Sequence, residues 1–213
     1  TSALSGAGTP SNCVAIGLTA MQAAATQTGT VAVGANALNA LTTGNKNTAL
    51  GYEALNTLTD SNGNTALGYN AMKTANQSNI HNNVAIGANS MDGIGTGDGP
   101  AWNIAIGVDS LGAALTGDNN VAIGQATGAA VTSGASNVII GSYAGDSLTT
   151  ALNNVAVGKD AMGAVTTATV DGAVAIGFQS LYGSSSTTTG ANYTVAIGKE
   201  ALKALTSGAG NTA

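Results

Sequence analysis

One four-residue phrase, Val-Ala-Ile-Gly, recurs with small variations from one end of the 213-residue chain to the other. The glycine that ends the phrase, called here the reference glycine, returns after intervals of 17, 17, 17, 19, 20, 17, 17, 17, 19 and 21 residues. Self-similarity at such a period is typical of stacked-repeat proteins, because one repeat can bury its apolar residues only against its neighbours. The eleven reference glycines are Gly17, Gly34, Gly51, Gly68, Gly87, Gly107, Gly124, Gly141, Gly158, Gly177 and Gly198.

Positions within a repeat are numbered from its reference glycine, so that −1 precedes it and +1 follows it. Positions −3 to −1 predict a short β-strand, since aliphatic residues alternate there with alanine in a run bounded by turn residues. Alternation places valine and isoleucine on one face of the strand, and alanine and glycine on the other. If the small face points outward, it forms a ledge suited to close contact with another backbone. If it lines a thin interior, the valine and isoleucine column points outward and needs burial by a partner. Both arrangements predict an oligomer.

Alanine or serine at +3 is usually followed by leucine or methionine at +4, as in Ala37-Leu38 and Ala71-Met72, and often by another aliphatic residue three positions on. The segment is too short for a stable helical turn, so we expect a second short strand and a corner. Two short strands and two corners in each turn predict an all-β fold, a parallel β-solenoid of about eleven turns of 17–21 residues. At a strand spacing of about 4.8 Å the rod would be about 50 Å long.

The intervals themselves repeat after five turns, which indicates duplicated five-turn blocks at about 17–106 and 107–197. Both ends fall within a repeat, so we expect residues 1–213 to be one continuous repeat domain cut from a longer fibre. Insertions cost least at the surface, so the extra residues of the long turns should bulge from one edge of the rod. They lie between Lys73 and Asn83, Asp92 and Asn103, Thr166 and Ala173, and Gly183 and Thr194.

Composition excludes several classes of protein. The chain has 31 glycines, only 3% aromatic and 7% charged residues, and a net charge of −5. All five basic residues are lysines, so there is no electrostatic footprint for nucleic acid. Cys13 is the only cysteine, which rules out an intrachain disulfide. No apolar run is long enough to span a bilayer, so we expect no membrane insertion in this segment.

Asparagine recurs at −4. In stacked turns we expect these amides to form a ladder, each bonded to the next and to corner backbone. A polar ligand-binding stripe is the alternative, but a structural ladder fits every turn alike. The residues concerned are Asn47, Asn64, Asn83, Asn103, Asn120, Asn137 and Asn154, with Asn211 at the same position near the end of the chain.

Catalytic groups are sparse. Acidic residues recur at +2, and glycoside hydrolysis needs two carboxylates about 5–9.5 Å apart. Only Asp160 and Glu200, two turns or roughly 10 Å apart by strand spacing, approach that range, and a solvated face explains them better. His81 is the only histidine, which excludes a histidine triad or a multi-histidine metal site within one chain. We therefore predict no enzyme, and no catalytic, cofactor-binding or metal-binding residues.

The phrases Asn83-Val-Ala-Ile-Gly87 and Asn120-Val-Ala-Ile-Gly124 resemble the head repeats of trimeric autotransporter adhesins of the YadA type. The fuller form Asn47-Thr-Ala-Leu-Gly-Tyr-Glu-Ala-Leu-Asn-Thr-Leu-Thr is similar to the related arrays of bacteriophage tail fibres. The resemblance covers nearly the whole chain. It implies a left-handed parallel β-roll assembled as a parallel homotrimer.

We expect a structural and adhesive segment of an extracellular or virion fibre, whose many copies add weak contacts with a host-cell surface glycan or protein. The candidate contact residues are the aromatic and histidine side chains of the long turns, because exposed aromatics often anchor binding. Two alternatives remain open: a subunit of a self-stacking extracellular filament, and a glycan-cleaving tailspike. The candidate contact residues are His81, Trp102, Tyr182 and Tyr193.

Overall fold

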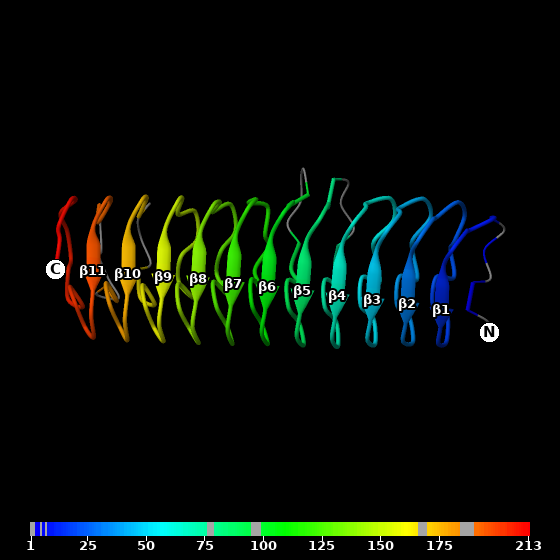
Figure 1. The fold of residues 1–213 in the computed structure, drawn as a ribbon, viewed down its shortest axis with the longest axis horizontal. Helices are drawn as coiled ribbons and strands as arrows, with labels where there is room; N and C mark the ends of the chain where they lie inside the picture. The colour runs from blue at the N-terminus through cyan, green and yellow to red at the C-terminus, as the bar shows by residue number, and fades with distance from the viewer. Residues whose placement is uncertain are drawn as a thin grey trace.

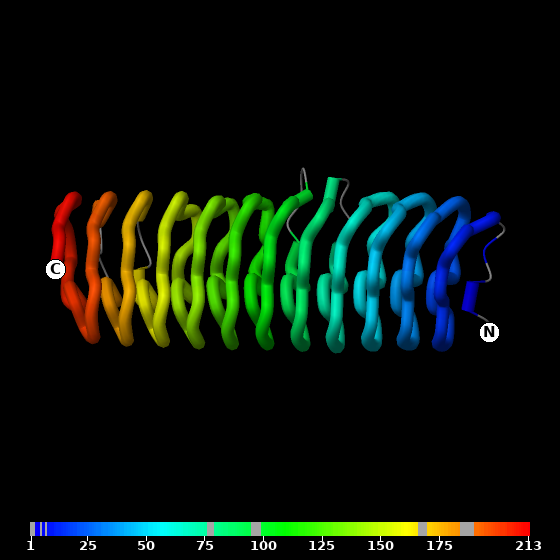
Figure 2. The backbone as a smooth tube through the Cα atoms, in the orientation of Figure 1, coloured from blue at the N-terminus to red at the C-terminus, as the bar shows by residue number. Residues whose placement is uncertain are grey.

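The chain forms a straight rod of stacked turns, with its N-terminus at one end and its C-terminus at the other (Figures 1 and 2). The computed structural model describes residues 3–4, 6, 8–75, 79–94, 99–165, 170–183 and 190–213. Within these ranges each repeat contributes one three-residue strand, and there is no helix. The strands are β1 (Val14–Ile16), β2 (Val31–Val33), β3 (Thr48–Leu50), β4 (Thr65–Leu67), β5 (Val84–Ile86), β6 (Ile104–Ile106), β7 (Val121–Ile123), β8 (Val138–Ile140), β9 (Val155–Val157), β10 (Val174–Ile176) and β11 (Val195–Ile197).

All strands belong to one parallel sheet in the order β1 to β11, so each turn pairs only with the turns before and after it. The register never shifts. Val14 lies opposite Val31, and Val174 lies opposite Val195, so equivalent positions of successive repeats form straight columns along the rod. The predicted parallel β-solenoid and its strand positions are confirmed.

The alanine face of the sheet points inward. The central strand residue is fully buried in every strand from β2 to β11, whereas the residues on either side of it are half-buried or exposed. A methyl group at this position lets the two walls of the rod approach closely, which suits a thin interior. Of the two arrangements that the alternation permitted, the structure has the one in which valine, isoleucine and leucine point outward.

The wall opposite the strands is not a second strand, so that prediction was wrong. Every residue at +2 and at +4 has a positive φ between 44° and 60°, for example 60° at Asn36 and 49° at Leu38. A left-handed conformation costs a non-glycine residue about 1–2 kcal/mol. Burial of the +4 side chain offsets this cost, as do hydrogen bonds between turns such as Leu38 N–H to Ala54 C=O at 3.0 Å. A positive φ at every second residue of this segment coils the backbone too tightly for an extended strand.

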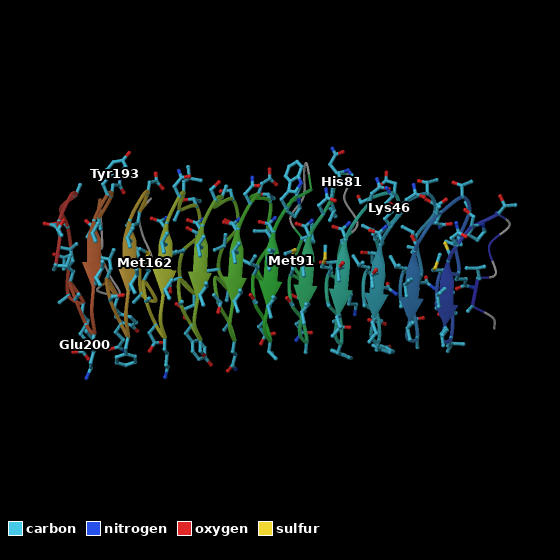
Figure 3. The ribbon with its side chains drawn as sticks, viewed as in Figure 1. Lys46, His81, Met91, Met162, Tyr193 and Glu200 are labelled. Atoms are coloured by element: carbon cyan, nitrogen blue, oxygen red, sulfur yellow. The ribbon has the colours of Figure 1, made fainter. Side chains whose placement is uncertain are left out.

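Side chains on the two walls compensate for each other in size. Most turns combine a strand alanine with leucine or methionine at +4, such as Met91 and Met162 in Figure 3. The strand β8 carries Ile139 in place of alanine, and position +4 is glycine both in the same repeat, Gly145, and in the preceding one, Gly128. A Cβ at either glycine would lie within 3.3 Å of the Ile139 side chain. One larger residue on the sheet therefore occupies the space that two missing side chains leave on the opposite wall.

The reference glycines are required by the closeness of the turns. Gly107 has a φ of 138°, and a Cβ built on it would lie 2.2 Å from the carbonyl oxygen of Gly124 in the next turn. The same clash with the next turn recurs along the column as far as Gly177. Glycine is the residue that tolerates both this φ and so close a backbone.

Replacing Gly107 by alanine is expected to lower the free energy of unfolding by at least about 2 kcal/mol, since strain in φ and a backbone clash coincide there. Gly198 is the matched control, because its φ is 124° but no atom lies within 4 Å of its hypothetical Cβ. Thermal unfolding followed by circular dichroism should show a clearly smaller loss for Gly198→Ala. Equal losses of stability in the two variants would mean that φ strain alone, without the backbone clash, accounts for the glycine at this position.

Candidate functional site

The asparagines at −4 form a buried ladder that runs without interruption from Asn47 to Asn154. Asn120 shows the pattern. Its Nδ2 donates to Asn103 Oδ1 at 3.1 Å and to the Gly134 carbonyl at 2.8 Å. Its Oδ1 accepts both the backbone N–H of Asn137 at 3.1 Å and the Nδ2 of Asn137 at 2.9 Å. Since these amides face the interior and satisfy one another, they hold the corner and offer nothing to a ligand.

The ladder stops where the repeat sequence departs from asparagine. Position −4 holds Thr30 before Asn47, and Ala173 and then Thr194 after Asn154; both threonine hydroxyl oxygens are buried without a hydrogen-bond partner. Nearby, Gln27 supplies a substitute amide, donating from Nε2 to the Leu41 carbonyl at 2.6 Å. Ala173 has no side-chain amide, and its backbone N–H donates to Asn154 Oδ1 at 2.9 Å. The middle of the rod is therefore the better bonded part.

Asn120→Ala is expected to destabilise the rod by about 2–4 kcal/mol, because it leaves buried groups of two neighbouring turns without partners. Asn56→Ala is the control. Its amide makes one bond, to the Asn36 carbonyl at 3.0 Å, in a partly exposed place, and the loss should stay below about 1 kcal/mol. Urea unfolding of both variants measures the difference. Comparable losses would contradict a structural role specific to the ladder.

Three of the four predicted contact residues lie on one edge of the rod, the upper edge of Figure 3, where His81 and Tyr193 are labelled. Trp102 and Tyr193 occupy position −5 with φ near 56°, and their side chains are 59% and 72% exposed. His81 lies beside Trp102, whose backbone N–H donates to the His81 carbonyl at 3.1 Å. His81 is half-buried, and its Nδ1 accepts the backbone N–H of Asn62 at 3.0 Å. The predicted bulges include residues 76–78, 95–98, 166–169 and 184–189, which lie outside the described residues.

The fourth contact residue, Tyr182, belongs to a different column. It occupies +5 and is half-buried, and its ring lies 3.0 Å from the Cβ position of Gly163 in the preceding turn. Tyr193 has the corresponding relation to Gly172 at the upper edge, where the ring lies 2.9 Å from the Cβ position. Each tyrosine thus covers a glycine of the turn before it, but the two do not share one surface.

Asp160 and Glu200 do not face each other directly. The turn between them places Gln179 in the same column, and Gln179 Nε2 donates to Asp160 Oδ2 at 3.5 Å. Glu200 forms an ion pair with Lys203 at 3.4 Å. The two carboxylates that the sequence brought nearest to catalytic spacing therefore have separate polar partners.

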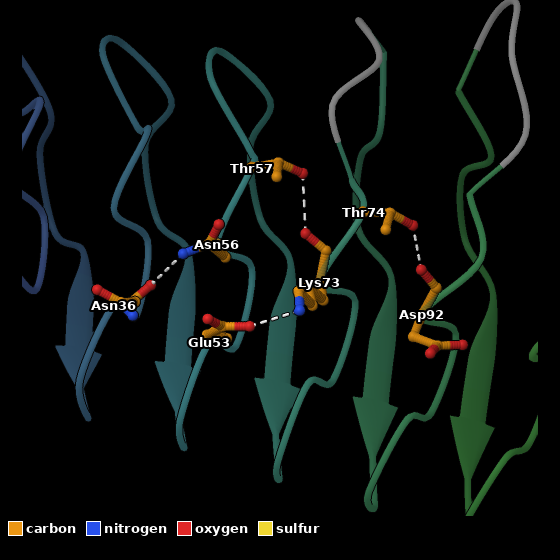
Figure 4. A network of polar contacts seen from close by, with 7 residues as sticks. All are labelled: Asn36, Glu53, Asn56, Thr57, Lys73, Thr74 and Asp92. Carbon is orange, nitrogen blue, oxygen red and sulfur yellow. Dashed lines mark hydrogen bonds and ion pairs between the residues drawn. The ribbon is translucent and has the colours of Figure 1, made fainter.

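A polar network on the wall opposite the strands was not predicted from the sequence (Figure 4). Lys73 Nζ lies 2.6 Å from Glu53 Oε2, and this contact lowers the pKa of Glu53 and raises the pKa of Lys73. Hydrogen bonding to the same carboxylate raises the pKa of Tyr52. Tyr52 in turn stacks on Tyr69, with ring centroids 5.6 Å apart and planes inclined by 10°. The two neighbouring Gly-Tyr dipeptides were the signal for this site.

Two other carboxylates on that wall have raised pKa values, because their surroundings disfavour the charged form. Burial raises the pKa of Asp92, and the nearby Asp109 carboxylate adds to the effect. Burial likewise raises the pKa of Asp146, where Asp160 contributes. No three histidine, cysteine, aspartate or glutamate side chains gather closely enough to hold a metal ion among the residues that the structure describes.

The outward face of the sheet is an apolar surface. It carries the −3 and −1 columns. Because the register is constant, these side chains form an apolar strip along the rod. Its most exposed members are Val14, Ile16, Leu50, Leu67, Ile123, Val138, Ile176 and Ile197.

Comparison with protein-family models, with curated proteins and with solved structures finds no match to this chain. In the described ranges, no helix has the length and apolar character needed to cross a membrane.

Proposed function

We propose that the chain is a structural and adhesive segment of an extracellular or virion fibre, in which copies of the rod bury their outward strand faces against one another as a parallel homotrimer. The observation that carries this proposal is the apolar strip. Contiguous apolar surfaces of this kind are rare on monomeric proteins and mark interaction sites.

A second copy of the chain suits the strip better than an unrelated partner. The strip has a repeat of one turn along its whole length, and another copy presents the same spacing of apolar side chains. Parallel packing about an axis along the rod would keep every turn level with its counterpart, so valine, isoleucine and leucine columns would interdigitate throughout. A symmetric closed assembly leaves no strip exposed.

The adhesive part of the proposal rests on the edge that carries Trp102 and Tyr193. Both side chains are exposed by more than half, yet the backbone holding them is tied into the turns by hydrogen bonds to His81 and Asp171. In a trimer each edge would occur three times, and weak contacts with a cell-surface glycan or protein would add by multivalency. Such a segment acts by geometry and needs no catalytic group or cofactor.

The oligomeric state in solution tests the proposed trimer. We expect light scattering coupled to size exclusion to give the mass of a trimer, and the double variant Leu50→Asn/Leu67→Asn to give monomers or a strongly concentration-dependent mass. Both leucines are exposed in the strip, so the isolated rod should still fold. Leu152→Asn, an exposed leucine at the upper edge, is the control and should remain trimeric. A monomeric parent protein at micromolar concentration would refute the proposed assembly.

Binding to cell surfaces tests the proposed adhesive role of the Trp102 and Tyr193 edge. The parent protein should bind at least one of three plated probes: fixed Gram-negative bacteria, fixed Gram-positive bacteria or an epithelial cell layer. Trp102→Ala/Tyr193→Ala should lower that binding at least about fivefold while mass and circular dichroism stay unchanged, because exposed aromatics contribute most to such contacts. Leu152→Ala supplies an edge control. Undiminished binding by the double variant would remove these two residues from the contact surface.

A further inference from the structure

The edge at which the strands end carries a feature that folding does not explain. Tyr52 and Tyr69 occupy +1 in adjacent turns and stack in parallel, yet they remain 46% and 56% exposed. Strand arrows in Figure 1 point toward this edge, and Glu200, at the neighbouring +2 position, is labelled there in Figure 3. The pair therefore lies on the edge opposite His81 and Tyr193.

Neighbours in the +1 column leave the outer ring faces uncovered. Ala35 stands one turn before Tyr52, and Ala88 stands one turn after Tyr69, so only a methyl group lies beside each ring within the column. The next larger members, Leu18 and Val108, lie two turns from the nearer tyrosine, about 10 Å away by strand spacing. The flat ring of a ligand therefore has room to stack on the outer face of either tyrosine, over the neighbouring alanine.

The polar surroundings hold the rings in place and are electrically balanced. Glu53 interacts with both Tyr52 and Lys73, and the Lys73–Glu53 distance is 2.6 Å. The backbone of Lys73 is fixed as well, because its carbonyl accepts the Thr57 hydroxyl at 2.8 Å. Such a partly exposed pair contributes little stability, but it orients Tyr52 and leaves no unpaired charge for an ionic ligand beside the rings.

We propose that the Tyr52–Tyr69 edge is a binding site for a neutral saccharide. The apolar C–H face of a pyranose ring packs on an aromatic face, and its hydroxyl groups need hydrogen-bonding neighbours. Tyrosine offers both, with little entropy to lose on binding. The Glu53 carboxylate and the Asn56 amide carry further hydrogen-bonding atoms on the adjoining wall. The site is separate from the contact edge proposed above, and it does not rest on that function.

The test uses two neutral probes, maltotriose and the trimer of N-acetylglucosamine, in saturation-transfer NMR titrations with the whole chain. We expect at least one to bind weakly, and Tyr52→Ala and Tyr69→Ala each to raise its Kd at least about fivefold. Tyr52→Phe keeps the ring and should retain most of the binding. Tyr143→Ala is the matched control, since Tyr143 is 41% exposed and lies four turns from Tyr69, and it should bind like the parent.

Circular dichroism and light scattering on the same samples separate the possible outcomes. Loss of binding with unchanged fold and mass supports the site. Failure of both neutral probes to bind the parent chain, or binding that persists in Tyr52→Ala and Tyr69→Ala, overturns it. A fall in oligomer mass in the alanine variants would also overturn it, because the tyrosines would then contact another copy of the chain. None of these results depends on binding at Trp102 and Tyr193.

Discussion

In-register hydrogen bonding between successive turns is the interaction on which the rest of the structure depends. Each strand donates to and accepts from its neighbours at the same positions, from β1 to β11. At this spacing two backbones meet at the reference glycine, where a Cβ would clash with the next carbonyl. The period of the glycines is therefore the period of the stack, and extra residues are admitted only where they do not disturb these bonds.

Constant register turns each position into a column with one environment. Alanine, leucine and methionine columns fill a thin interior, and the asparagine column satisfies its own amides and the corner backbone. The interior is thus nearly the same in every turn. Side chains of differing chemistry occur in the outward columns. The apolar strip, the upper edge and the tyrosine stack are therefore the surfaces available for function.

Much of this was predictable from the sequence, since alternation and spacing report local geometry directly. Strand positions, parallel stacking and the asparagine column followed from a short phrase that recurs every 17–21 residues. The second strand was wrong because Leu38 and its equivalents look like strand residues, whereas turn-to-turn bonding and burial hold them at positive φ. The Glu53–Lys73 pair was missed because its members belong to different positions of different turns, and side-chain reach across columns is not visible in a linear pattern.

The sequence by itself determined the repeat, the register and the residues that share a column, because a fixed period of aliphatic residues and glycine permits only one way of stacking. Only the tertiary structure decided which side of the strand faces inward. Alternation separates two faces without ranking them; the coiling of the opposite wall, with its left-handed residues at +2 and +4, brings that wall against the alanine face. The larger aliphatic side chains are then left outside, where they form the apolar strip.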